Sequence, residues 1–132
     1  MRKSLSLAAL ALALGAMAPA AAHAQGNAKM PAAPKGKEVT ITGVVVDVSC
    51  KFGQGLSGAS HQMCAQVCAD KGIPLAILTK EGKLYIPTSA AMPGDNQNPQ
   101  LKEFAEQEVT VTGKAFSAGG AEAIQIATVK KA

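Results

Sequence analysis

Three cysteines and one histidine lie close together in this sequence. Cys50, Cys64 and Cys68 have the spacing Cys-x13-Cys-x3-Cys, and His61 lies between the first two. On a helix, His61, Cys64 and Cys68 occupy positions i, i+3 and i+7, which share one face. Thiolate and imidazole are ligands of tetrahedral Zn²⁺, and thiolates also select Cu(I). The sequence therefore predicts a metal site of three cysteines and one histidine, holding Cu(I) or Zn²⁺.

Three more residues are accessory candidates for this site. Met63 and Met92 carry thioethers, which suit Cu(I). On an ideal helix, however, Met63 points about 100° away from Cys64. Asp47 precedes Cys50 closely and can accept a hydrogen bond from a ligand, or it can simply end a strand.

Two other uses of the cysteines stay open at this point. A disulfide from Cys50 to Cys64 or Cys68 would close a loop of about 14 to 18 residues and stabilise the fold by roughly 3 kcal/mol, leaving one spare thiol. A Cys64–Cys68 bond is less favourable, because residues at i and i+4 of a helix lie too far apart for a disulfide. The third use is thiol redox chemistry.

The first residues have the pattern of a secretory signal peptide. Arg2 and Lys3 precede an apolar run from Leu5 to Met17, and Ala22-His23-Ala24 has the small residues of a cleavage site. The run is shorter than the ~20 residues of a membrane-spanning helix. We therefore expect cleavage after Ala24, a periplasmic or secreted protein, and no membrane anchor after cleavage.

The part that would remain is the size of one domain. The whole chain has 132 residues and a net charge of +4, which falls to +2 when Arg2 and Lys3 are removed. This weak charge does not favour a nucleic-acid partner. Residues 25–37 are polar and rich in Pro and Ala, so they predict a flexible leader before a domain of residues 38–132.

The domain predicts a mainly β fold. The expected strands cover 38–48, 75–79, 83–88, 108–116 and 122–129, with a glycine-rich loop over 53–60, a helix over 60–72 capped by Ser60, and a helix from 98 or 99 to 107. Five strands with a helix between the third and fourth is the order of the OB-fold, a Greek-key barrel. The Cys-bearing helix is then an insertion after the first strand.

Two segments of the domain are nearly identical. Residues 38–43 read EVTITG and residues 108–113 read EVTVTG. A pair of copies 70 residues apart is too few for a repeat protein. We expect two strands with the same local role, as neighbours that share a bend, and Gly43 predicts a bulge or bend.

The chain resembles two groups of exported bacterial proteins. Residues 109–113 and the Cys-x13-Cys-x3-Cys insert are similar to those of small OB-fold-like proteins without a settled activity, and this resemblance covers residues 38–129. It implies the fold. The Cys-x3-Cys unit with its histidine is similar to a motif of copper-delivery proteins of respiratory oxidase assembly, which have another fold. This second resemblance implies Cys64, Cys68 and His61 as ligands.

Together these features predict an exported copper- or zinc-binding protein acting in metal delivery, storage or resistance, with another exported protein or metal acceptor as its partner. The alternative is an OB-type binding module for a protein, peptide or glycan, in which the cysteines are structural. A thiol redox protein is the third hypothesis. No hydrolase, phosphate-binding or dinucleotide motif is present, so the sequence does not favour an enzyme.

Overall fold

A long, bent strand begins the folded domain. The structure, a computed structural model, describes residues 34–132, so the expected signal peptide and most of the expected leader lie outside the described residues. The strand, β1, covers Lys37–Asp47 and is rich in β-branched residues, as strands are. The other elements, in chain order, are α1 (Val48–Gln54), the 3₁₀ turn η1 (Ala59–His61), α2 (Gln62–Asp70), β2 (Leu75–Thr79), β3 (Leu84–Pro87), α3 (Asn98–Leu101), the 3₁₀ turn η2 (Lys102–Phe104), β4 (Glu108–Ala118) and β5 (Ala121–Lys131).

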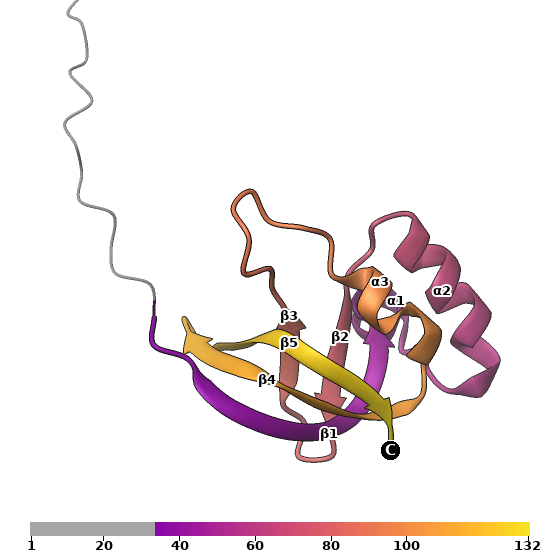
Figure 1. The fold of residues 1–132 in the computed structure, drawn as a ribbon. Coiled ribbons are helices and arrows are strands. Elements are labelled where there is room, and N and C mark those ends of the chain that lie inside the picture. The colour runs from indigo at the N-terminus through magenta and orange to yellow at the C-terminus, as the bar shows by residue number, and fades with distance from the viewer. Residues whose placement is uncertain (1–33) are drawn as a thin grey trace, which may run out of the picture. The chain divides into compact units, whose positions relative to one another are not determined.

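The five strands form a closed barrel in the order β1-β2-β3-β5-β4. The pair β3–β5 is parallel, and the other neighbours are antiparallel. This architecture confirms the predicted OB-fold-like barrel with inserted helices. The three helices gather at the end of the barrel where β1 ends (Figure 1).

The two similar hexapeptides pair with each other in the barrel. They run antiparallel, with Ile41 opposite Val111 and Val39 opposite Gly113. A β-carbon at Gly113 would overlap the carbonyl oxygen of Gln125, at the point where the register between β4 and β5 shifts. At Gly43, β1 pairs with both β4 and β2, and a β-carbon would lie 2.6 Å from the Leu78 carbonyl oxygen. The shared role of the two segments is therefore to let neighbouring strands approach closely at a bend.

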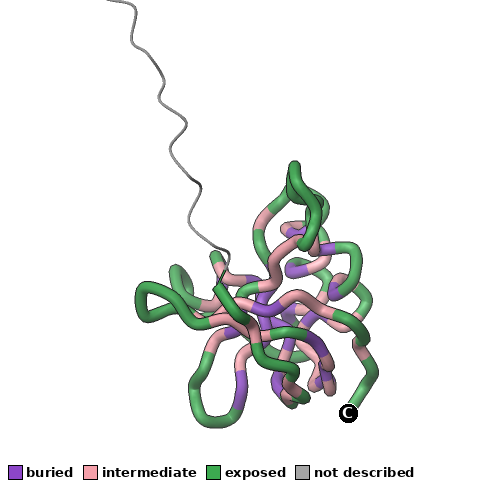
Figure 2. The backbone as a smooth tube through the Cα atoms, turned by 60° about the vertical axis from the view of Figure 1, so that its left-hand side comes forward, coloured by how far each residue is buried: buried purple, intermediate pink, exposed green. Residues whose placement is uncertain are grey.

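The barrel interior holds the hydrophobic core, and aliphatic side chains dominate it. Figure 2 shows buried segments in the strands and among the helices, while most of the connecting loops are exposed. The core cluster consists of Val45, Ala69, Leu75, Ile77, Tyr85, Leu101, Val109, Val111 and Ile124. Ala69 belongs to α2 and Leu101 to α3, so the same core that closes the barrel also fixes two of the helices.

The first insert differs from the sequence prediction. Residues after β1 form the helix α1, where a strand end and a loop were expected. The side chain of Asp47 caps this helix by accepting a hydrogen bond from the Cys50 amide at 3.0 Å, and Gly55 ends it with φ 70°. The expected helix over 60–72 is η1 followed by α2, and its first turn starts after Gly58 without a side-chain cap, so the predicted cap at Ser60 is wrong.

One buried amide attaches α2 and α3 to the barrel. The side-chain oxygen of Asn98 accepts from the Leu75 amide at 3.0 Å, and its nitrogen donates to the carbonyls of Ala69 and Ile73 at 3.0 and 2.8 Å. These bonds satisfy the end of α2 and the start of β2 together. The helix predicted up to residue 107 is the short α3 continued by η2, which ends at Phe104.

Candidate metal centre

Cys50 lies at the centre of the cysteine cluster. It stands one turn into α1, and its residue is only 6% exposed. Its position is fixed by Asp47, whose side chain caps the same turn. The sequence predicts Cys50 just past the end of a strand, with the glycine-rich loop bringing it over the helix. In the structure, Cys50 lies on the short helix α1.

Cys64 and Cys68 come from α2, on successive turns of that helix. Their sulfur atoms and that of Cys50 all lie within 4.8 Å of one another. Burial decreases outward across the three, because Cys50 is buried, Cys68 is intermediate and Cys64 is exposed. All three thiols are free within the described residues. The structure therefore brings together the three predicted cysteines as a cluster of thiols with one exposed edge.

A second group shares Cys50 with the thiols. The ligand atoms of Asp47, Cys50 and His61 also lie within 4.8 Å of one another, and all three residues are buried. Oδ2 of Asp47 and Nε2 of His61 are buried and have no hydrogen-bond partner within the described part of the chain. An unpaired buried polar atom costs about 1–3 kcal/mol. A cation bound between these three residues could satisfy both of the unpaired atoms.

Glu106 orients His61. Its Oε1 lies 3.0 Å from Nδ1 of His61, and its Oε2 accepts from the Gly58 amide at 2.7 Å. A carboxylate only accepts, so Nδ1 carries a proton, and whenever the ring is uncharged Nε2 has a free lone pair. Carboxylates hold metal-binding histidines in this way.

The backbone at Glu106 is strained, and the surroundings maintain it. Its φ is 60°, the one positive value at a non-glycine residue in the described chain. Its amide donates to the Val45 carbonyl at 2.7 Å, which holds this conformation, and its side chain is only 1% exposed. Strain of this kind gathers at functional sites. Sequence reasoning missed Glu106, because nothing in the local sequence connects it with His61, 45 residues away.

The carboxylate of Asp47 affects the nearby thiols. Its interaction with the Cys68 thiol, together with burial, raises the pKa of Cys68 to about 12. Burial is the first cause that raises the pKa of Cys50, and Asp47 is the second. Oδ2 of Asp47 forms no hydrogen bond of good geometry with the described residues, so Asp47 raises these pKa values because its carboxylate lies close to the thiols. Protonated thiols are poor nucleophiles, so these values do not favour thiol redox chemistry. A bound cation displaces the protons.

Both methionines are exposed, so neither belongs to the buried group of Asp47, Cys50 and His61. The residue Met63 on α2 is 77% exposed, and Met92, in the connection from β3 to α3, is 84% exposed. Asp47, the third predicted accessory residue, is fully buried and close to Cys50. Cys/Asp/His groups in this arrangement can hold a metal ion.

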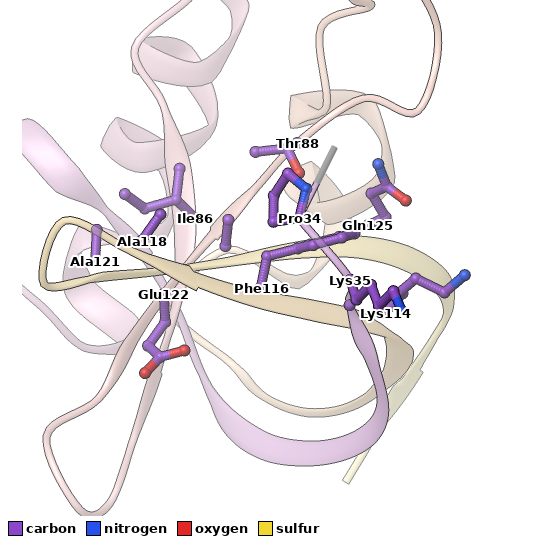
Figure 3. A pocket seen from close by; sticks show the side chains of 12 residues that line it. Pro34, Lys35, Ile86, Thr88, Lys114, Phe116, Ala118, Ala121, Glu122 and Gln125 are labelled. Atoms are coloured by element: carbon purple, nitrogen blue, oxygen red, sulfur yellow. The ribbon is translucent and has the colours of Figure 1, made fainter. Parts of the chain in front are cut away.

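A separate cavity lies on another part of the barrel. Its volume is about 830 Å³, and none of its lining residues belongs to the cysteine cluster. Figure 3 shows Pro34, Ile86 and Phe116 in this cavity, with the lysine side chains of residues 35 and 114 at one side. This volume lies within the usual range of small-ligand pockets, about 300–1,000 Å³.

Comparison of the chain with protein-family models, curated proteins and solved structures finds no match. Among the described residues, no helix is both long and apolar enough to cross a membrane. The site itself is a cluster of thiol, imidazole and carboxylate groups that can hold a metal.

Proposed function

We propose that this chain is an exported metal-binding protein that holds Cu(I) or Zn²⁺ in the cluster around Cys50. One observation carries the proposal: Nε2 of His61 and Oδ2 of Asp47 are buried without partners among the described residues, and both side chains have a ligand atom within 4.8 Å of the Cys50 sulfur. Hydrogen bonds within the protein do not account for this arrangement, whereas coordination of a cation satisfies both atoms at once.

Delivery to another exported protein is the role that this cluster supports best. Cys64 is exposed while Cys50 is buried, so the cluster has an edge that another protein's ligands can reach. Ligand exchange needs such an edge, whereas a structural site is closed on all sides. The proposed partner is a metal acceptor that presents its own thiolate or thioether groups.

The test is metal content. Purified residues 25–132 are loaded with Cu(I) or Zn²⁺ under reducing, anaerobic conditions and analysed by elemental mass spectrometry. We expect one ion per chain, and loss of both metals in Cys50→Ser. Ser49→Ala, an exposed neighbour on the same helix, is the control and keeps both. Absence of stoichiometric metal in the unmodified protein would overturn the proposal.

Export has a test of its own. The pattern of Arg2, Lys3, the apolar run and Ala22-His23-Ala24 supports cleavage after Ala24. The intact mass of protein taken from its native cell should therefore correspond to a chain that begins at Gln25, recovered from the periplasm or the medium. A cytoplasmic protein with an uncleaved terminus would contradict it.

The separate cavity favours a second function, binding of a partner peptide or small molecule by the barrel. Phe116 and Ile86 give the cavity an apolar wall, and Lys35 and Lys114 give it a basic side. An amphipathic anion is the matching probe. Anilinonaphthalene sulfonate should fluoresce with the protein and lose most of this signal in Phe116→Ala. Phe52→Ala, at a 62% exposed residue of α1, is the control, and equal loss in both variants would argue against the cavity.

A further inference from the structure

The cluster contains two overlapping sets of ligands that share one atom. The first set is Asp47, Cys50 and His61, and the second is Cys50, Cys64 and Cys68. Within each set the ligand atoms lie within 4.8 Å of one another. The sulfur of Cys50 belongs to both, so an ion held by one set occupies a ligand that the other set needs.

The inner set has the chemistry of a site for a divalent cation. It offers a carboxylate oxygen, a thiolate and an imidazole nitrogen, which are the ligand types of zinc. The carboxylate and the thiolate together balance the two positive charges of such an ion, as burial requires. Glu106 holds His61 through Nδ1, so Nε2 is the ring nitrogen left for a metal. Three protein ligands leave a fourth position for Cys68, water or another ligand.

The outer set has the chemistry of a site for a soft monovalent cation. Its three ligands are all sulfur, which selects Cu(I) over harder ions. It lies toward solvent, because Cys68 is half-buried and Cys64 is exposed. Solvent at the exposed Cys64 lowers the cost of the excess negative charge of a Cu(I) thiolate cluster.

We propose that the two sets bind different classes of metal and exclude each other: the inner set takes a zinc-class divalent cation, and the outer set takes Cu(I). This inference rests on the proposed metal-binding function and assigns the ligands within it. Its consequence is that Cu(I) and Zn²⁺ compete for the protein although most of their ligands differ.

The experiment is a double dissociation measured by competition with chromophoric chelators. Asp47→Asn keeps an N-cap for α1 and should weaken Zn²⁺ binding at least about tenfold while Cu(I) affinity stays within a few-fold. Cys64→Ser should do the reverse. Asp70→Asn and Val67→Ser are matched controls, because both residues are exposed on α2. If each cluster variant weakens both metals equally, the inference is overturned.

A second measurement does not depend on whether the variants fold. X-ray absorption of the unmodified protein should show only sulfur around copper, and a mixture of sulfur with nitrogen or oxygen around zinc. The same shell of ligands around both metals would overturn the inference while leaving metal binding intact. Failure of Cys50→Ser to abolish either metal would instead contradict the proposed site itself, so the two failures are distinct.

Discussion

At the scale of the residue, the site depends on atoms whose hydrogen-bonding capacity the fold leaves unused. One carboxylate oxygen of Asp47 accepts the hydrogen bond that caps α1, and the other is buried without a partner in the part of the chain that the structure describes. Nδ1 of His61 forms a hydrogen bond with Glu106, and Nε2 has no hydrogen-bond partner among the described residues. Each residue is therefore anchored by one atom and available through the other, which is how rigid metal ligands are held.

The first prediction concerns Glu106. Glu106→Gln can donate a hydrogen bond to Nδ1 and so stabilises the wrong tautomer of His61, which should lower Zn²⁺ affinity about 10- to 100-fold. Glu103→Gln is the matched control, because Glu103 is exposed on the preceding turn. Nitrogen-15 NMR of the histidine ring in the metal-free protein reads the tautomer directly, and an unchanged tautomer in Glu106→Gln would contradict the assigned role.

The second prediction concerns thiol reactivity. The raised pKa values of Cys50 and Cys68 keep these thiols protonated in the metal-free protein. The reactive thiolate forms only as the pH approaches the pKa of the folded protein, which is about 12 for Cys68. At about pH 8, iodoacetamide should therefore label the exposed Cys64 first. The labelling rate of Cys68 should still be rising with pH above the range where an ordinary thiol, with pKa about 8.5, is fully ionised. Peptide mapping by mass spectrometry at several pH values reads both.

At the scale of the element, two short helices carry the cysteines, and strands of the barrel hold these helices in place. α1 follows β1 without a loop, so the end of the strand fixes Asp47 and Cys50 directly. The Asn98 side chain ties the end of α2 to β2, which fixes the helix that carries Cys64 and Cys68. The cluster thus depends on how these two helices are attached to the barrel.

The third prediction tests the bends at which the strands approach closely. Gly113→Ala places a β-carbon against the Gln125 carbonyl and should destabilise the domain by about 1–3 kcal/mol. Gly53→Ala is the opposite case, because nothing lies within 4 Å of the added carbon and the residue is helical. It should be neutral or stabilise by up to about 1 kcal/mol. Urea unfolding measures both, and equal effects would refute the close approach at Gly113.

At the scale of the whole molecule, the ligands and the distant residue that orients His61, Glu106, meet at one end of the barrel. The end of β1, the insert with α1 and α2, and the segment before β4 all contribute, and Figure 1 shows the helices gathered there. A cation held at this point adds a further link between the end of β1 and the insert that carries α1 and α2. Metal binding and folding stability must therefore be coupled.

The fourth prediction follows from this coupling. Metal at a hundred times its Kd should stabilise the fold by about 2.7 kcal/mol, which for a domain of this size raises Tm by roughly 10–20 °C. A chelator should reverse the shift, and Cys50→Ser should show none. Scanning calorimetry under reducing conditions measures it. A Tm that does not respond to Cu(I) or Zn²⁺ in the unmodified protein would contradict the coupling.

The sequence by itself determined the barrel and the kinds of ligand. β-branched runs, turn residues and the paired hexapeptides predict local structure, because each acts through its own neighbours in the chain. The cysteines and His61 were predicted as site residues from type and spacing alone. The same local reasoning missed α1, because residues 48–54 form a short segment that contains Gly53 and has no amphipathic pattern.

Only the tertiary structure decided how the site is organised. The burial of Asp47, the free nitrogen of His61 and the contact of His61 with Glu106 depend on contacts between segments far apart in the sequence. A carboxylate looks the same in the sequence whether it is solvated or enclosed. Packing against the barrel removes the water, and this desolvation turns Asp47 and Glu106 from ordinary acidic residues into parts of the candidate metal centre.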